Sequence, residues 1–423
     1  MSKSNKRLKI SAGDQPAETS TLSSTKLPAD LVIEIFKKLP AALALARFRC
    51  VCRSWRDLLS DPAFLRQILV TEQDSDDSRQ IIIFRLTGDR EPIFSPCSYD
   101  TLLPLSADPP RPVVLPSTRG VGYNSCRIVG YDNGIFCLSN RTQEPNGIHL
   151  YNPATSETKA LPPSPFTSPE RRHSLFCGPM FGFDPTTNDY KLVRLKKAGK
   201  RRAGEGVIVR FAEVYSLMRD SWSKVETCGD VDLISRFMTN TAIPIPECHD
   251  GKCYLWNREY CCSRMTKVLS FDLAKEAFEV VDVLDPAVED NGTMFPLHIT
   301  FSRGSMVAVF SSHRNMGVVL QVWMMLKYGV AASWVKLYDV PGDEDYYMPY
   351  RCLGMWKGWK CVFVRRRRKK EVGRSYFGGE VVVFDPRTRD VVDFGVRAYR
   401  KDVKIVWNHV PNRVSVVGFA DTN

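Results

Sequence analysis

Apolar side chains between residues 27 and 69 recur every three or four positions, which is the spacing of one face of an α-helix. The pattern consists of two long runs and a short one, with the apolar members Leu31, Ile35 and Leu39, then Leu45, Phe48, Cys52, Trp55 and Leu59, then Phe64, Leu65 and Ile68. Pro40 closes the first run and Pro62 opens the third, as proline does at helix ends. The pattern therefore predicts a small all-α module of three helices.

A module of roughly 40 residues has too little interior to be stable alone, so part of its apolar surface is expected to contact a partner. Its short motifs stand in the order Leu27-Pro28, Asp30, Ile33-Glu34-Ile35, Leu39-Pro40, Arg47-Phe48-Arg49-Cys50-Val51-Cys52, Ser54-Trp55 and Asp61-Pro62-x-Phe64. In this order they resemble the F-box motif of plant F-box proteins, with one residue more than the usual pattern between Leu39 and Arg47. The resemblance implies a three-helix module that docks on the Skp adaptor of a cullin-RING ubiquitin ligase.

The same resemblance implies which side chains face the adaptor and, through it, connect the chain to a cullin. These residues are Leu27, Pro28, Leu31, Ile35, Leu39, Pro40, Val51 and Trp55. The alternative interpretation is an ordinary helical hairpin that packs on the downstream part of the chain.

From residue 81 onward the helical spacing gives way to short apolar runs that each follow a turn. The recurring turn positions are Gly134, Asp189, Gly251, Gly304 and Gly358, which are 55, 62, 53 and 54 residues apart. A period near ~50 residues with several strands per unit is typical of kelch-type propeller blades. We predict an all-β kelch-like propeller of six blades, closed by a strand near residues 414–418. Seven blades are the alternative count, and a solenoid is the alternative fold.

The first repeats carry further motifs, and these suggest a family and a domain organisation. The motifs are Asn133-Gly134 with Leu138, Tyr151-Asn152-Pro153, Phe181-Gly182-Phe183-Asp184-Pro185-Thr186-Thr187-Asn188-Asp189-Tyr190-Lys191-Leu192-Val193, and Val214-Tyr215-Ser216-Leu217. They are similar to the plant F-box-associated interaction domain, which implies that this region recruits a protein substrate. Past about residue 280 the similarity rests mostly on the period. We predict a disordered tail over 1–25, an F-box over 26–70, a linker over 71–79 and the propeller over 80–420.

The composition of the chain limits which partners and which cellular compartment we expect. No apolar run approaches the ~20 residues that cross a bilayer, and the polar N-terminus has no signal-peptide core, so we expect a soluble protein of the cytoplasm and/or nucleus. In such a compartment the 13 cysteines are expected to be reduced. The net charge of +12 is concentrated in residues 194–202 and 365–370, which fit solvated loops, a substrate-docking patch or a nuclear import signal. Neither run is interleaved with aromatic residues, so nucleic acid is not an expected partner.

The sequence contains no familiar catalytic constellation. It has no Walker loop, no dinucleotide fingerprint, no H-E-x-x-H and no G-x-S-x-G, and its six histidines are scattered. The one candidate metal cluster is Cys248-His249, Cys253 and Cys261-Cys262, whose spacing differs from paired C-x2-C zinc knuckles. We expect these cysteines to pack as small apolar side chains, and we predict no catalytic residue, no metal and no cofactor.

Taken with the two resemblances, these observations predict the substrate-recognition subunit of an SCF-type cullin-RING ubiquitin ligase, in which other subunits transfer ubiquitin. One alternative is a kelch-type scaffold without a ligase role. The other is a propeller enzyme of the galactose-oxidase kind. Substrate-binding residues are not assigned, and the repeats differ most from one another in residues 158–179, 196–206 and 339–351.

Overall fold

The computed structural model describes Leu31, Val51, Arg53 and Trp55 of the N-terminal part and most of the strand-rich part. In the latter it covers residues 80–86, 92–101, 103–108, 110, 112–113, 126–140, 147–166, 176–198, 208–225, 246–255, 267–282, 294–302, 304–314, 317–330, 333–340, 351–357, 359–366, 378–399, 403–409, 411 and 414–417. The predicted tail over 1–25 and the linker over 71–79 lie outside the described residues. No helix within these ranges is long and apolar enough to cross a membrane.

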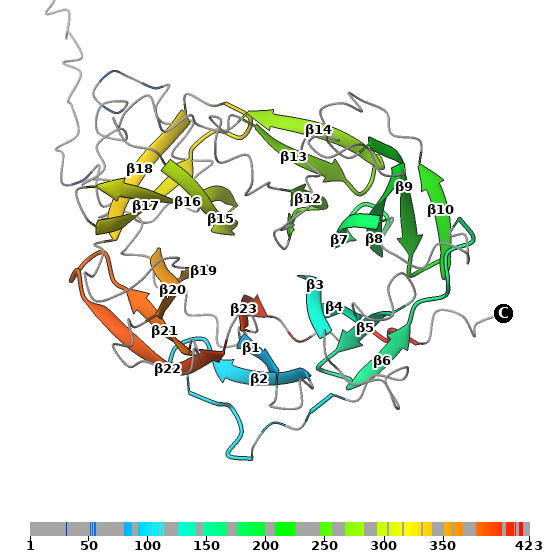
Figure 1. Cartoon of the computed structure of the whole chain (residues 1–423), viewed down its shortest axis with the longest axis horizontal. Helices are drawn as coiled ribbons and strands as arrows, with labels where there is room; N and C mark the ends of the chain where they lie inside the picture. Colours follow the sequence, from blue (N-terminus) through cyan, green and yellow to red (C-terminus); the bar gives the residue numbers. More distant parts are fainter. Residues whose placement is uncertain are drawn as a thin grey trace, which may run out of the picture.

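Six antiparallel sheets form a ring around a central axis (Figure 1), and we call them blades 1 to 6. Blade 1 has the order β2-β1-β23, and blades 2 to 6 are the meanders β3–β6, β7–β10, β11–β14, β15–β18 and β19–β22. Their bounds are β1 Gln80–Leu86, β2 Pro92–Ser98, β3 Cys126–Asp132, β4 Ile135–Asn140, β5 Ile148–Asn152, β6 Glu157–Ala160, β7 Phe176–Asp184, β8 Asp189–Ala198, β9 Ile208–Ser216, β10 Ser221–Val225, β11 Glu247–His249, β12 Lys252–Leu255, β13 Lys267–Asp272, β14 Ala277–Asp282, β15 Met294–Ser302, β16 Ser305–Arg314, β17 Gly317–Met325, β18 Trp334–Val340, β19 Arg351–Trp356, β20 Lys360–Arg366, β21 Gly378–Phe384, β22 Val391–Tyr399 and β23 Lys404–His409. The predicted six-bladed propeller is confirmed for this part of the chain.

The hydrophobic core is divided into six clusters, one at each junction between neighbouring blades. In β1, Ile81 and Ile83 belong to the cluster with blade 6, whereas Ile82 and Phe84 belong to the cluster with blade 2. Successive side chains of a strand point to opposite faces, so a strand that is buried on both faces has a continuous apolar run. This explains why β1 has the continuous apolar run Ile81–Phe84 and does not alternate between apolar and polar residues.

The turns that recur in the sequence are the hairpins between the first and second strands of the blades. Asn133 and Gly134 have φ of 41° and 87°, and Asp250 and Gly251 have φ of 48° and 71°. Two successive positive φ values suit a two-residue hairpin turn, which favours Asn-Gly and Asp-Gly. Because the strands are antiparallel, these turns and those between third and fourth strands lie on one face of the ring, which we call the turn face.

Ring closure differs from the prediction. β23 closes the ring by pairing with β1, with Gln80 opposite His409 and Ile83 opposite Ile405. Pro411 follows β23 and lacks the N–H that a further ladder bond requires. Residues 414–417 then pack on blade 2, where the Val416 N–H donates to Glu157 Oε2 at 3.0 Å. The predicted closing strand near 414–418 is therefore wrong.

Asp132 at the end of β3 links blade 2 to blade 3, because its Oδ2 accepts the Phe183 N–H at 2.8 Å. Burial, with a smaller contribution from the nearby Glu247 carboxylate, raises the pKa of Asp132 to about 7, although hydrogen bonds from the Phe183 and Asn133 N–H groups lower it. A carboxyl whose pKa is raised by folding stabilises the fold below its unfolded pKa, and this stability is lost as pH rises through about 7.

We therefore expect Asp132→Asn to be more stable than the native chain at pH 8, because the variant keeps an acceptor oxygen and buries no charge. The advantage should shrink by roughly 2 kcal/mol between pH 8 and pH 5. Urea unfolding at the two pH values measures it. An advantage independent of pH would contradict the account.

Candidate functional site

The helical module is represented by four described residues. Leu31, Arg53 and Trp55 are helical, as the apolar spacing predicts. Leu31 and Val51 are 51% and 60% exposed, so both are accessible to a second protein. The other residues predicted to face the adaptor lie outside the described part of the chain; they are Leu27, Pro28, Ile35, Leu39 and Pro40. All eight assignments stay predictions.

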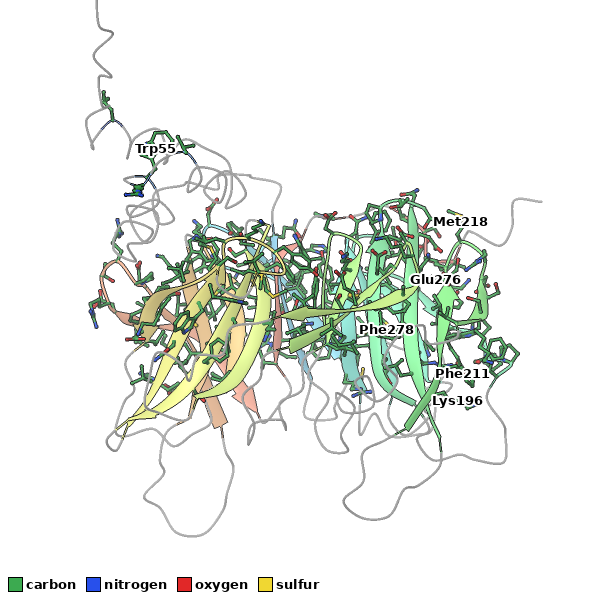
Figure 2. The ribbon with its side chains drawn as sticks, turned by 90° about the horizontal axis from the view of Figure 1, so that it is seen from above. Trp55, Lys196, Phe211, Met218, Glu276 and Phe278 are labelled. Atoms are coloured by element: carbon green, nitrogen blue, oxygen red, sulfur yellow. A yellow bond between two sulfur atoms is a disulfide. The ribbon has the colours of Figure 1, made fainter. Side chains whose placement is uncertain are left out.

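Trp55 differs from Leu31 and Val51, because it is half-buried and packs against the cluster between blades 5 and 6. Figure 2 shows it beyond the face that carries Met218 and Glu276, which is the turn face. An adaptor contact by Trp55 would compete with this packing. The packing of Trp55 on the propeller is what the alternative interpretation, a helical hairpin packed on the downstream part of the chain, predicts for this position.

The long motif of blade 3 holds neighbouring blades together. Burial alone would raise the pKa of Asp184, but hydrogen bonds from Thr187 Oγ1 at 2.6 Å and from the Lys191 ammonium lower it below its ordinary value. Lys191 Nζ also donates to the Leu273 carbonyl of blade 4 at 2.7 Å. On the other side the Tyr190 hydroxyl donates to the carbonyl of Asn133 in blade 2 at 2.7 Å. These contacts give the motif a structural role at the junctions of blade 3 with blades 2 and 4.

The two basic runs begin in the second strands of blades 3 and 6 and leave them on the face opposite the turn face. Arg194 is buried, pairs with Glu213 at 2.8 Å and lies 3.9 Å from the centroid of the Trp222 ring. Arg365 pairs with Glu380 at 3.1 Å. These two arginines thus contribute to the blades, while residues 199–202 and 367–370 lie outside the described residues. Docking and nuclear import by the runs stay predictions.

The predicted cysteine cluster contains a disulfide. Cys248 and Cys253 lie directly opposite each other in the β11–β12 hairpin, with Cα atoms 4.1 Å apart, and their sulfurs are bonded. The expectation of reduced cysteines is wrong for this pair, because the two-residue turn aligns them in a register that the sequence spacing alone did not reveal. Cys261 and Cys262 lie outside the described residues. Across the described ranges no group of three or more His, Cys, Asp and Glu could hold a metal ion.

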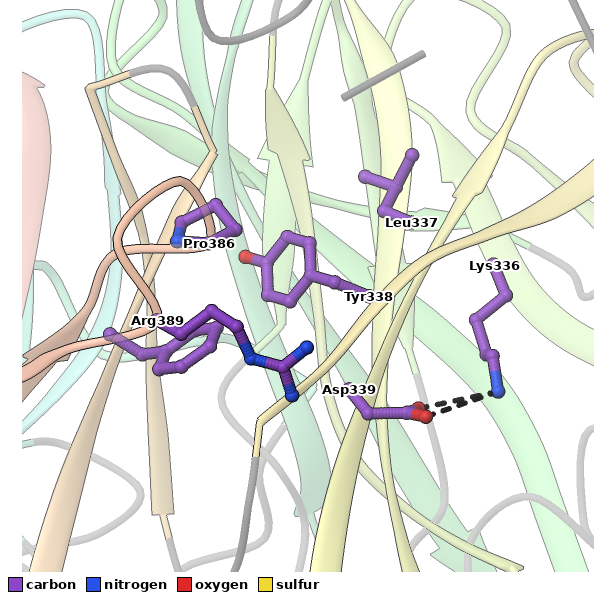
Figure 3. Close-up of a pocket in the computed structure, with 7 residues that line it drawn as sticks. Lys336, Leu337, Tyr338, Asp339, Pro386 and Arg389 are labelled. Carbon is purple, nitrogen blue, oxygen red and sulfur yellow. Dashed lines mark hydrogen bonds and ion pairs between the residues drawn. The ribbon is translucent and has the colours of Figure 1, made fainter. Parts of the chain in front are cut away.

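A pocket that the sequence did not indicate lies between blades 5 and 6 (Figure 3). We call it the blade 5–6 pocket; it is lined by Lys336, Leu337, Tyr338, Asp339, Phe384, Pro386 and Arg389. Asp339 is the first residue of one variable region named above. The other lining residues lie in strands and in a tight turn, where the sequence gives no signal that distinguishes them from residues of the fold.

The comparisons with known proteins agree with both parts of the chain. Residues 25–71 match the family model described as F-box-like, and residues 112–390 match the F-box associated beta propeller domain. F-box protein CPR1 of Arabidopsis thaliana is 27% identical over 326 residues, which are 74% of this chain and 73% of that protein. The Arabidopsis F-box/kelch-repeat protein At3g23880 is 24% identical over 77% of this chain and 83% of its own length. Because the propeller model covers more than half of the chain, this protein belongs to the family of F-box proteins with an F-box associated β-propeller domain.

Proposed function

We propose that this chain is the substrate-recognition subunit of an SCF-type cullin-RING ubiquitin ligase, with the F-box on a Skp-family adaptor and the propeller on a protein substrate. One observation carries the proposal: a single chain joins an F-box-like segment to a propeller that buries its core clusters between its own blades. The exposed Leu31 and Val51 are therefore not needed for the propeller fold and are available to the adaptor.

The proposed mechanism is proximity. The chain enters the ring at Gln80, at the end of β1 that lies on the turn face, so the helical module is tethered on that side. A substrate held by the propeller would have its lysines close to a ubiquitin carrier held through the adaptor and cullin. Such tethering raises the effective concentration of the reacting groups without any catalytic group on this chain.

The rival functions are a scaffold without a ligase role and a propeller enzyme. F-box proteins in general act as non-catalytic adaptors, which favours the receptor over the enzyme. The scaffold makes a different prediction from the receptor, because a scaffold partner is bound but not consumed. The two are separated by the fate of the captured protein.

We expect the tagged native chain and a Leu27→Ala, Pro28→Ala double variant to capture the same proteins from cells, because the propeller is unchanged. Under the proposal at least one shared protein carries ubiquitin and is less abundant with the native chain than with the double variant. Quantitative mass spectrometry of the captured material, with a proteasome inhibitor as control, measures both properties. Equal abundance and equal modification of every shared protein would favour the scaffold and overturn the proposal.

A further inference from the structure

The size of the blade 5–6 pocket limits what it can hold. Its volume is about 270 Å³. Pockets for whole small-molecule ligands are usually about 300–1,000 Å³ and enclose most of the ligand. This pocket is at the small end of that range and has room for one side chain that enters it from a longer molecule.

One wall of the pocket is aromatic and fixed in place. Tyr338 of β18 and Phe384 of β21 are both buried, and their ring centroids lie 5.7 Å apart at 36°. The Tyr338 hydroxyl donates to the carbonyl of Trp359, and burial raises its pKa, so it remains a donor. The phenol is thus committed to the fold, and the edges of the two rings that line the pocket form its apolar wall.

The polar groups of the pocket carry a net positive charge. Lys336 Nζ donates to Asp339 Oδ2 at 3.3 Å and lies 3.3 Å from Oδ1, which is shielded from solvent and has no hydrogen-bond partner among the described residues. Arg389 is exposed, and no ion pair, hydrogen bond or ring contact engages its guanidinium within the described ranges. Figure 3 shows this guanidinium directed from the β21–β22 turn toward Asp339. Two cations against one carboxylate leave the pocket with a charge of about +1.

The β21–β22 turn holds Arg389 at the pocket. The φ angle of Arg389 is 65°, and the Arg389 N–H donates to the Asp385 carbonyl at 2.8 Å. The turn carries two carboxylates: Asp385 pairs with Lys360 at 2.7 Å, and Asp390 forms no ion pair with Arg389 within the described residues. Arg387 lies on the same turn, is also exposed and does not line the pocket. The chain thus supplies a matched arginine two residues away.

The location of the pocket favours a polypeptide as the occupant. β18 is the outermost strand of blade 5, and its outer edge pairs with no strand of the described part of the chain. An extended peptide can add to such an edge through main-chain hydrogen bonds while alternate side chains fill neighbouring pockets. A carboxylate of charge −1 would neutralise the pocket. A phosphate, with about −1.5 to −2, would leave excess negative charge beside Asp339.

We propose that the blade 5–6 pocket binds the carboxylate of a glutamate or aspartate side chain in an extended segment of the recruited protein. Arg389 and Lys336 engage the carboxylate, the aromatic wall contacts its methylene groups, and the segment lies along β18. This inference names a substrate class for the proposed receptor function and rests on it. The carboxylate ligand also complements the positive net charge of the chain.

The test uses the full chain purified with its Skp adaptor and a library of about ten-residue peptides with random flanks. The central residue is fixed as glutamate, glutamine, lysine or phosphoserine. We expect glutamate peptides to be enriched over glutamine peptides by the native chain and by Arg387→Ala. Arg389→Ala should reduce this enrichment at least about tenfold, because it removes a charge-assisted contact, and Arg389→Lys should restore part of it.

Asp339→Asn provides a change of opposite sign, since removing the pocket carboxylate should strengthen binding of glutamate peptides and should help phosphoserine peptides more. Equal enrichment by Arg389→Ala and Arg387→Ala would overturn the proposal, as would a preference of the native chain for phosphoserine, lysine or glutamine. Thermal unfolding of each variant shows whether it is folded. Binding of the Skp adaptor is measured separately in the same preparation. Failure to bind the adaptor would count against the proposed function, whereas an Arg389→Ala variant that still enriches glutamate peptides would count against the pocket.

Discussion

Replacing Leu27 and Pro28 together by alanine is expected to weaken binding of the Skp adaptor by about 30-fold or more. Each apolar anchor of an interface typically costs more than about 1 kcal/mol when truncated, and about 1.4 kcal/mol corresponds to a factor of ten. Titration calorimetry with purified adaptor measures the change. This double variant addresses the predicted docking surface directly, because no blade contains these two residues.

The chain offers a control with the same dipeptide. Leu103-Pro104 lies at the edge of blade 1, and Leu103 is 65% exposed. Replacing both of these residues by alanine removes the same two side chains and should leave adaptor affinity unchanged. Equal losses in the two double variants would show that the effect is not specific to the F-box and would contradict the assignment.

Gly182→Val is expected to destabilise the propeller by about 3 kcal/mol or more, at the upper end of overpacking effects. A Cβ at this position would lie 2.9 Å from Leu273 Cδ1, 3.0 Å from Cys253 Sγ and 3.1 Å from Cys248 Cβ. The two cysteines are bonded to each other across the β11–β12 hairpin, so neither side chain can rotate away from the added group. Denaturant unfolding, followed by tryptophan fluorescence, measures the loss.

Gly304→Ala is the control for this prediction. Nothing lies within 4 Å of a Cβ at Gly304, and its φ is 75°, so only the backbone cost of about 1 kcal/mol applies. A loss at Gly182 no larger than that at Gly304 would contradict the close approach of blades 3 and 4.

Much of the propeller could be predicted from the sequence because its determinants are local. Asn133-Gly134 and Asp250-Gly251 adopt the positive φ values of hairpin turns, and their spacing reveals the period of the blades. Ring closure could not be predicted in this way. It depends on pairing between β1 and β23, which are more than 300 residues apart, and several apolar segments near the C-terminus suit that role equally well. The regular period favoured 414–418, but the long-range pairing selects Lys404–His409.

The candidate sites show the same division. The helical module is recognisable because its motifs are contiguous, whereas the packing of Trp55 on blades 5 and 6 depends on how two parts of the chain meet. The blade 5–6 pocket brings Tyr338 and Arg389 together from different blades. Each residue alone resembles an ordinary strand or turn residue. The Cys248–Cys253 disulfide can be predicted only when the strand register is known, because the register places the two residues opposite each other.

The central claim is that one chain holds an adaptor and a substrate at the same time, so ubiquitin transfer is its most direct test. The reaction is reconstituted from the Skp adaptor, a cullin with its RING subunit and a ubiquitin carrier, the full chain and a protein captured by it. We predict that the captured protein is modified with the native chain and that modification falls to background with the Leu27→Ala, Pro28→Ala variant. No modification by the native chain, or equal modification by the variant, would contradict the account.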